Sequence, residues 1–266
     1  MRKIFFICLA IIVALPSFAQ KTKKEKRDER KQRINELIKQ EEEGVIAYHK
    51  ETAFGIKLNS DGYGAFLEFG RAKSVQKALL FQLEISERKH PKEEKQTNIS
   101  IPTAPFIFGK VNYFYPVKLG VQQQILLGNK INRNGVSVTG NIGGGISLAL
   151  LRPYFLEVND ITNGNRKYIR YESSDSSIFV SPGDLQALQV SGSGLGKGWS
   201  SMTVTPGLYT KLALRFDYGR FNEMVNALEV GISADFYSKK VPQIVYVAPK
   251  QFFFGAYVTI MFGRRK

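Results

Sequence analysis

The chain is poor in the side chains that most often carry catalysis, redox chemistry and metal binding. Its 266 residues include one cysteine, one tryptophan and two histidines. Cys8, the only cysteine, lies within a short apolar run at residues 4–15. If this run is removed on export, the mature chain contains no thiol, which excludes disulfides and thiolate chemistry. Because no cluster of His, Cys and acidic residues has ligand spacing, we expect neither a metal nor another cofactor.

Long hydrophobic runs are also missing. A transmembrane helix needs about 20 consecutive apolar residues, and the run at residues 4–15 is shorter. Arg2 and Lys3 precede this run, and the small-x-small triplet Ser17-Phe18-Ala19 follows it. This order is typical of a secretory signal peptide, so we expect residues 1–19 to be cleaved. Residues 20–44 are almost all charged or polar, and we expect them to form a solvated, partly helical periplasmic tail.

From residue 45 onward, apolar residues alternate with small or polar ones. Successive side chains of a strand point to opposite faces, so a period of two indicates β-strands. We identify eight such segments, near residues 52–58, 63–70, 79–86, 110–122, 136–150, 208–217, 228–236 and 252–262. In the last segment one face is purely apolar and consists of Phe252, Phe254, Ala256, Val258, Ile260 and Phe262.

The second face of these segments distinguishes two architectures. A soluble sandwich has long polar side chains on its outward face. Here the second face is rich in Gly, Ala and Ser with scattered charges, which suits the crowded interior of a narrow barrel. Aromatic residues such as Tyr63, Phe69, Tyr218 and Phe262 lie toward segment ends, where membrane barrels carry their aromatic girdles. A soluble sheet stays open as the alternative.

The lengths of the connections give an independent argument. Every second connection is short, at residues 72–76, 128–135 and 219–223. The others are longer, at residues 88–105, 151–206 and 238–250, except for a tight Asp-Gly turn at residues 59–62. Short periplasmic turns and long outside loops are typical of outer-membrane barrels. We predict an all-β, eight-stranded antiparallel up-and-down transmembrane β-barrel over residues 45–263. Ten strands are the alternative, if residues 167–172 and 177–180 extend the barrel.

On these segments, between Val45 and Phe262, the chain resembles small bacterial outer-membrane barrels of the OmpA/OmpX-like kind. Gln20 at the predicted mature start and the Lys-rich tail are similar to barrels from Bacteroidota. The resemblance implies a fold and an outer-membrane location rather than an activity. Such barrels usually finish on an aromatic residue, whereas Phe262 is followed by the stretch 263–266. We expect no peptidoglycan-binding domain after the barrel.

Charged residues on the small-residue face would share the narrow interior. They are Glu68, Glu84, Lys118, Lys211, Arg215, Asp217, Glu229 and Asp235, together with Glu51, Lys57 and Lys110. A turn centred near Asn222 places Arg215 directly across from Glu229. These charges either form a paired plug or line a gate or proton path. We favour the plug, because eight-stranded interiors are filled by side chains.

The net charge is +15 at pH 7, and export excludes nucleic acid as the partner. Basic residues mark the predicted periplasmic rim at Arg71, Lys73, Lys77, Lys130, Arg133, Arg220 and 264–266. We expect outer-membrane lipid and lipopolysaccharide as partners, with peptidoglycan or envelope proteins as further alternatives. In the long loop, a contact site for a partner or for lipopolysaccharide phosphate would consist of Arg166, Lys167, Tyr168, Arg170 and Tyr171. A plain solvated loop is the other interpretation.

Catalytic residues are difficult to assemble from this sequence. His49 precedes the first strand and His90 opens an outside loop, and no unique serine and acid complete a triad with either. We therefore predict no enzymatic activity and a binding, scaffolding or envelope-stabilising role in the cell outer membrane. Two alternatives stay open: an accessory barrel subunit of a secretion or assembly machine of the type IX kind, and a lipid-modifying enzyme that uses His90 and a loop serine.

Overall fold

The computed structural model describes residues 24–25, 27–29, 31–32, 35–36, 49–97, 104–129, 135–159, 166–172, 189–194, 196–219 and 224–266. The chain forms two units, Met1–Val45 and Ile46–Lys266. In the first unit the described residues are helical and exposed. The predicted signal peptide lies outside the described residues. Within the described ranges, no helix has the length and apolar character needed to cross a membrane.

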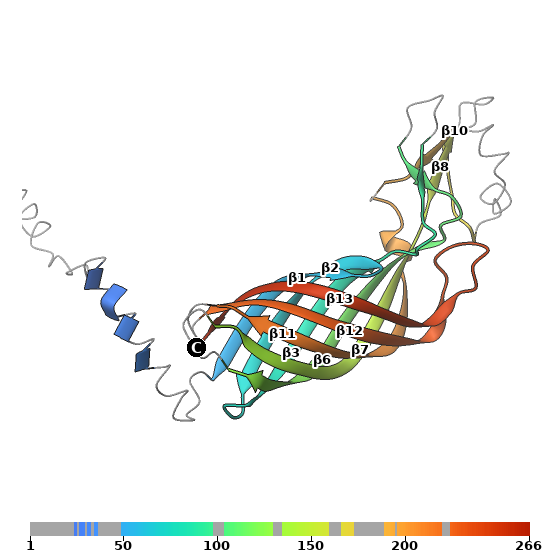
Figure 1. Cartoon of the computed structure of the whole chain (residues 1–266). Coiled ribbons are helices and arrows are strands. Elements are labelled where there is room, and N and C mark those ends of the chain that lie inside the picture. The colour runs from blue at the N-terminus through green and yellow to red at the C-terminus, as the bar shows by residue number, and fades with distance from the viewer. Residues whose placement is uncertain are drawn as a thin grey trace, which may run out of the picture. The chain divides into compact units, whose positions relative to one another are not determined.

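The second unit contains a closed antiparallel barrel (Figure 1). Its eight strands are β1 (Lys50–Asn59), β2 (Gly62–Ala72), β3 (Lys77–Arg88), β6 (Asn112–Gly128), β7 (Ser137–Pro153), β11 (Thr203–Asp217), β12 (Met224–Val241) and β13 (Lys250–Arg265). Each barrel strand pairs with the next along the chain, and β13 closes against β1 with Phe262 opposite Phe54. The predicted eight-stranded up-and-down barrel is confirmed.

Burial in the barrel wall is the reverse of that in a soluble protein. On β1, Phe54 and Ile56 face outward with 58% and 66% of their surface exposed, whereas Glu51 and Lys57 face inward with 3% and 1% exposed. The same alternation follows the other barrel strands, with mostly apolar side chains outside and a mixture of charged, polar and buried apolar ones inside. A soluble monomer rarely exposes contiguous apolar surface beyond a few hundred Å². The apolar residues of the alternating pattern therefore face outward, which is not expected of a soluble monomer.

The connections differ in length between the two ends of the barrel. At one end, the short-turn end, they comprise residues 73–76, 129–136 and 218–223, and both β1 and β13 have their outer termini there. At the other end, the long-loop end, they comprise residues 60–61, 89–111, 154–202 and 242–249. The predicted long loop at 151–206 was too wide, because Leu151 pairs with Thr203 and Leu148 with Pro206 in the barrel wall. The last strand also continues past Phe262 to Arg265.

Short strands of the long connections form two further sheets outside the barrel. The first has the order β10 (Gln189–Gly192), β8 (Leu156–Asn159) and β9 (Arg166–Ile169), and the second pairs β4 (Lys95–Gln96) with β5 (Phe106–Ile107). The ten-stranded alternative is wrong, because β9 pairs with β8 and not with a barrel strand. Residues 177–180, the other half of the predicted hairpin, lie outside the described residues. A single 3-10 turn, η1 (Trp199–Ser201), precedes β11.

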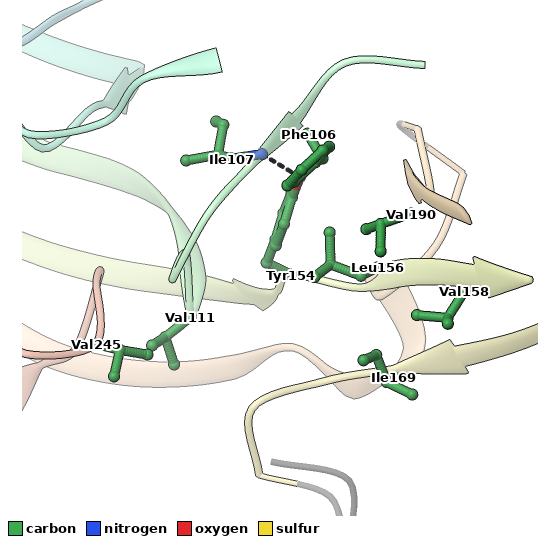
Figure 2. Close-up of a cluster of buried hydrophobic side chains, with 9 residues drawn as sticks. All are labelled: Phe106, Ile107, Val111, Tyr154, Leu156, Val158, Ile169, Val190 and Val245. Carbon is green, nitrogen blue, oxygen red and sulfur yellow. Dashed lines mark hydrogen bonds between the residues drawn. The ribbon is translucent and has the colours of Figure 1, made fainter. Parts of the chain in front are cut away.

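Three long connections share one hydrophobic core, and we call this assembly the loop lobe (Figure 2). Its buried residues are Phe106, Ile107, Val111, Tyr154, Leu156, Val158, Ile169, Val190 and Val245. The Ile107 backbone N–H donates a hydrogen bond of 2.8 Å to the Tyr154 hydroxyl. The Val245 N–H donates to the Gly109 carbonyl, also at 2.8 Å. The connections are therefore held together by a core and a backbone network of their own.

Candidate functional site

The barrel interior contains the charged residues that the strand alternation assigned to it. Glu68, Glu84, Lys118, Lys211, Arg215, Asp217, Glu229 and Asp235 are all buried on the inner face. They come from five of the eight strands, so the ion pairs between them join distant parts of the wall. Because a buried charge is costly unless it is paired and hydrogen-bonded, the partners of each group decide what this interior can do.

Glu229 on β12 is the centre of the network. It lies directly opposite Arg215 of β11 in the register, and the two side chains form an ion pair of 2.9 Å. Lys211 lies 3.3 Å from the same carboxylate. Two neutral donors complete the set, with the Tyr257 hydroxyl at 2.9 Å and the Asn141 amide at 2.8 Å. The Glu229 carboxylate thus accepts from four different side chains and is held in one position.

Further pairs continue from this centre toward both ends of the barrel. On the long-loop side, the ion pairs are Lys57–Glu84 at 2.9 Å, Lys118–Asp235 at 2.7 Å, Arg88–Asp235 at 2.6 Å and Arg88–Asp61 at 2.6 Å. On the short-turn side they are Arg215–Glu68 at 2.8 Å, Arg265–Glu51 at 2.8 Å and Arg265–Asp217 at 2.8 Å. The pairs extend through the interior as a network of compensated charges.

Aromatic side chains fill the interior at the long-loop end. Phe114 and Phe253 pack with ring centroids 5.2 Å apart, and Tyr237 packs edge-on against Phe114. The Tyr237 hydroxyl shares a hydrogen bond of 2.8 Å with the Ser147 hydroxyl. In the wall, an added Cβ at Gly120 would overlap the Tyr209 hydroxyl, so this position needs glycine to admit the ring. Such filling suits the predicted plug of charges.

Sequence reasoning placed three charged residues wrongly. Lys110 lies outside the barrel interior, because β6 begins at Asn112 and Lys110 pairs with Glu93 at 2.6 Å in a long connection. Arg265 was assigned to the rim and Arg88 to a loop, yet both are inward-facing strand residues of the network. Extending the inward positions by steps of two, from Ser86 on β3 and from Met261 on β13, would have identified both arginines. Both strands continue beyond the last residue of their outward apolar face.

The predicted loop contact lies on the edge strand of the loop lobe. Arg166, Lys167 and Tyr168 of β9 are exposed, while Ile169 anchors the strand in the lobe core. Arg170 is half-buried and Tyr171 is exposed in the turn that follows. The structure adds Lys197, whose ammonium lies 4.4 Å from the centroid of the Tyr168 ring. This lysine is 29 residues away along the chain, so sequence proximity could not identify it.

His90, the candidate for catalysis, takes part in a local turn. Its Nδ1 accepts a hydrogen bond of 3.2 Å from the Lys92 backbone N–H, and its own N–H donates to the Glu93 carboxylate at 3.1 Å. Burial lowers the pKa of the His90 imidazole below its usual value. The Nδ1 atom of His90 therefore takes part in the turn. Among the described residues, no group of His, Cys and acidic side chains could hold a metal ion.

Comparisons with known proteins gave structural neighbours only. No family model and no curated protein matches the chain. Among solved structures, the attachment invasion locus protein Ail of Yersinia pestis, in complex with the heparin analogue sucrose octasulfate, matches at 9% identity and TM-score 0.37, covering 82% of this chain and 99% of Ail. The N-terminal β-barrel domain of Pseudomonas aeruginosa OprF matches at 8% and 0.36, covering 81% and 98%.

Neisserial surface protein A matches at 10% identity and TM-score 0.37, covering 82% of this chain and 96% of that protein. All of these neighbours are outer-membrane β-barrel proteins. At such low identity and TM-score no residue role is carried over from them. The fold of this chain, a closed eight-stranded antiparallel barrel, rests on its own strand order and register.

Proposed function

We propose that the protein is an integral outer-membrane barrel that displays a folded binding lobe at the cell surface and carries out no chemistry of its own. The observation that carries this proposal is the loop lobe. Three connections from one end of the barrel share a core that neither closes the barrel nor fills its interior. Ordering long loops costs conformational entropy, and the shared core offsets this cost. Binding residues often lie on loops that a rigid scaffold holds in place, and the core gives these loops such a scaffold.

The outward apolar face supports insertion in a membrane. A bilayer removes this face from water, and the closed strand order leaves no unpaired sheet edge in lipid. In outer-membrane barrels the short turns are periplasmic and the long loops extracellular. We therefore orient the loop lobe toward the outside of the cell, with the short-turn end in the periplasm.

The filled interior argues for binding rather than transport. The central charges are compensated within the barrel, and the aromatic side chains Phe114, Tyr237 and Phe253 pack at its long-loop end. Moving solute through this interior would require several buried ion pairs to break together, each at a cost of about 3–5 kcal/mol if one partner is left unpaired. We infer that the interior stabilises the barrel.

The ligand that best fits the loop lobe is anionic. The edge strand β9 exposes Arg166, Lys167 and Tyr168, and Lys197 lies over the tyrosine ring. Cations beside an exposed aromatic ring suit phosphate groups carried on a sugar ring, because the ring supplies apolar contact and the ammonium groups supply charge. We propose phosphorylated lipopolysaccharide sugars as the ligand class.

The test compares two double variants that remove the same charge from the same end of the barrel. Lys167→Ser with Lys197→Ser should weaken binding of purified lipopolysaccharide by about ten- to thirtyfold, from about 1 kcal/mol per cation. The control, Lys239→Ser with Lys240→Ser, removes two exposed lysines of β12 that are outside the lobe core. Calorimetry on the detergent-purified protein measures both. Equal affinities for the two variants would refute the contact site.

A further inference from the structure

The outward face of the barrel carries an apolar groove across β13, β1, β2, β3 and β6. Its volume is about 820 Å³, and its lining includes Phe54, Ile56, Ala65, Leu67, Ile260 and Phe262. The register explains the hollow. Ala65 lies opposite Ile56 on one side and Ile85 on the other, so a small side chain is flanked by two large ones in the wall.

A cluster of cations lies beside one end of this groove. Lys50, Arg71, Arg264 and Lys266 are exposed and share the outward face with the groove residues. Lys50 pairs with Arg71 in the register and exchanges backbone hydrogen bonds of 2.8 Å with Lys266, which joins three strands at the short-turn end. Arg264 follows Phe262 by two positions, or about 7 Å along β13.

The acidic residues nearby face the other way. Glu51 and Glu68 lie between these outward positions on β1 and β2, but both are buried in the interior and pair with Arg265 and Arg215. Within the described ranges, no ion pair connects any of the four outward cations to an acidic side chain. The short-turn rim beside the groove is therefore positively charged, and its charge is not compensated by the barrel wall.

We propose that this groove and rim bind one anionic phospholipid, with an acyl chain in the groove and the phosphate among Lys50, Arg71, Arg264 and Lys266. The proposal rests on the membrane insertion and orientation proposed above, which place the short-turn end in the periplasmic leaflet. A glycerophospholipid fits both parts of this site, because its negatively charged phosphate lies close to its acyl chains. A free phosphate would leave the groove unused.

A second copy of the chain fits this surface less well. Two barrels related by a twofold axis along the membrane normal would bring identical rims together at the same depth. Eight cations would then face each other, and like charges placed across an interface disfavour association. Anionic lipid instead compensates the same charges, so the cation cluster decides between these occupants.

The experiment is native mass spectrometry of the full-length protein in detergent, with dioleoyl phosphatidylglycerol and dioleoyl phosphatidylethanolamine as competing probes. The wild-type protein should retain one phosphatidylglycerol at about tenfold preference. Replacing all four cations by Gln should remove that preference. Ala65→Phe, which fills the groove and leaves the rim intact, should reduce phosphatidylglycerol retention, whereas Ala234→Phe on β12, an outward position outside the groove, should not.

Each other result contradicts the proposal. Equal retention of the two phospholipids by the wild-type protein, an unchanged preference in the rim variant, or unchanged phosphatidylglycerol retention in Ala65→Phe would overturn the site. Displacement of phosphatidylglycerol from the rim by purified lipopolysaccharide would overturn the assignment to the periplasmic leaflet. A wild-type protein that does not insert into vesicles would overturn the proposed function along with the site. Insertion without lipid preference would overturn the site alone.

Discussion

At the scale of single residues, Glu229 shows why polar side chains can fill a barrel. Its carboxylate accepts from two cations, Arg215 and Lys211, and from the neutral donors Tyr257 and Asn141. Each donor comes from a different inward position, so the site exists only when the strands are in register. The buried carboxylate therefore links side-chain chemistry to strand register.

Removing this carboxylate should be costly. In Glu229→Ala, Arg215 keeps Glu68, but Lys211 loses the one acidic side chain with which it pairs in the described part of the chain, and an uncompensated buried charge costs about 3–5 kcal/mol. Guanidinium unfolding of the refolded protein in detergent measures the loss. The control, Glu94→Ala, changes an exposed loop carboxylate and should remain within about 0.5 kcal/mol of the wild type. Similar values for the two variants would mean that the network contributes little to stability.

At the scale of elements, the sequence predicts a strand where alternation within one segment defines it. It does not predict a strand that is defined only by pairing with distant segments. The faces of the long strands follow from alternation alone, and Phe262 and Tyr257 lie outside and inside as the period of two predicts. The register of Arg215 with Glu229 follows from a single turn. By contrast, β8, β9 and β10 are four residues each and form strands only through pairing across distant loop segments. Such partners leave no local signal.

Strand ends were predicted less well than strand faces for a related physical reason. The apolar face ends where lipid contact ends, but hydrogen bonding between strands continues beyond it. Arg88 and Arg265 lie in this outer part of their strands. Every second residue still faces inward there, although the outward residues are no longer hydrophobic. Sequence alone therefore found the middle of the charge network and missed both of its ends.

The two faces of β13 provide the prediction for this scale. Ile260→Asn places a polar amide on the outward apolar face, where lipid offers it no hydrogen-bond partner. The control, Thr259→Asn, puts the same amide on the next residue, which faces the polar interior opposite Glu229 and Lys57. After refolding into lipid vesicles, the fraction that migrates as folded protein on unheated gels should be lower for Ile260→Asn. Equal fractions would mean that the faces are assigned wrongly.

At the scale of the whole molecule, the second unit contains two interiors of different chemical character. The barrel carries apolar side chains outside and a compensated polar interior, whereas the loop lobe has an ordinary buried apolar core. Lipid is the surrounding solvent that suits the first arrangement, whereas water is the solvent that suits the second. Co-purification of a stoichiometric protein partner would favour the accessory-subunit alternative, and the loop lobe would then be its docking surface.

The most direct test of membrane insertion is the fractionation of cells that express the chain, with urea extraction of the membranes before detergent is added. An integral barrel buries its outward apolar face in lipid and should remain in the outer-membrane pellet, from which only detergent releases it. Release of the folded protein into buffer by urea washing, or its recovery as a soluble protein without detergent, would contradict the account.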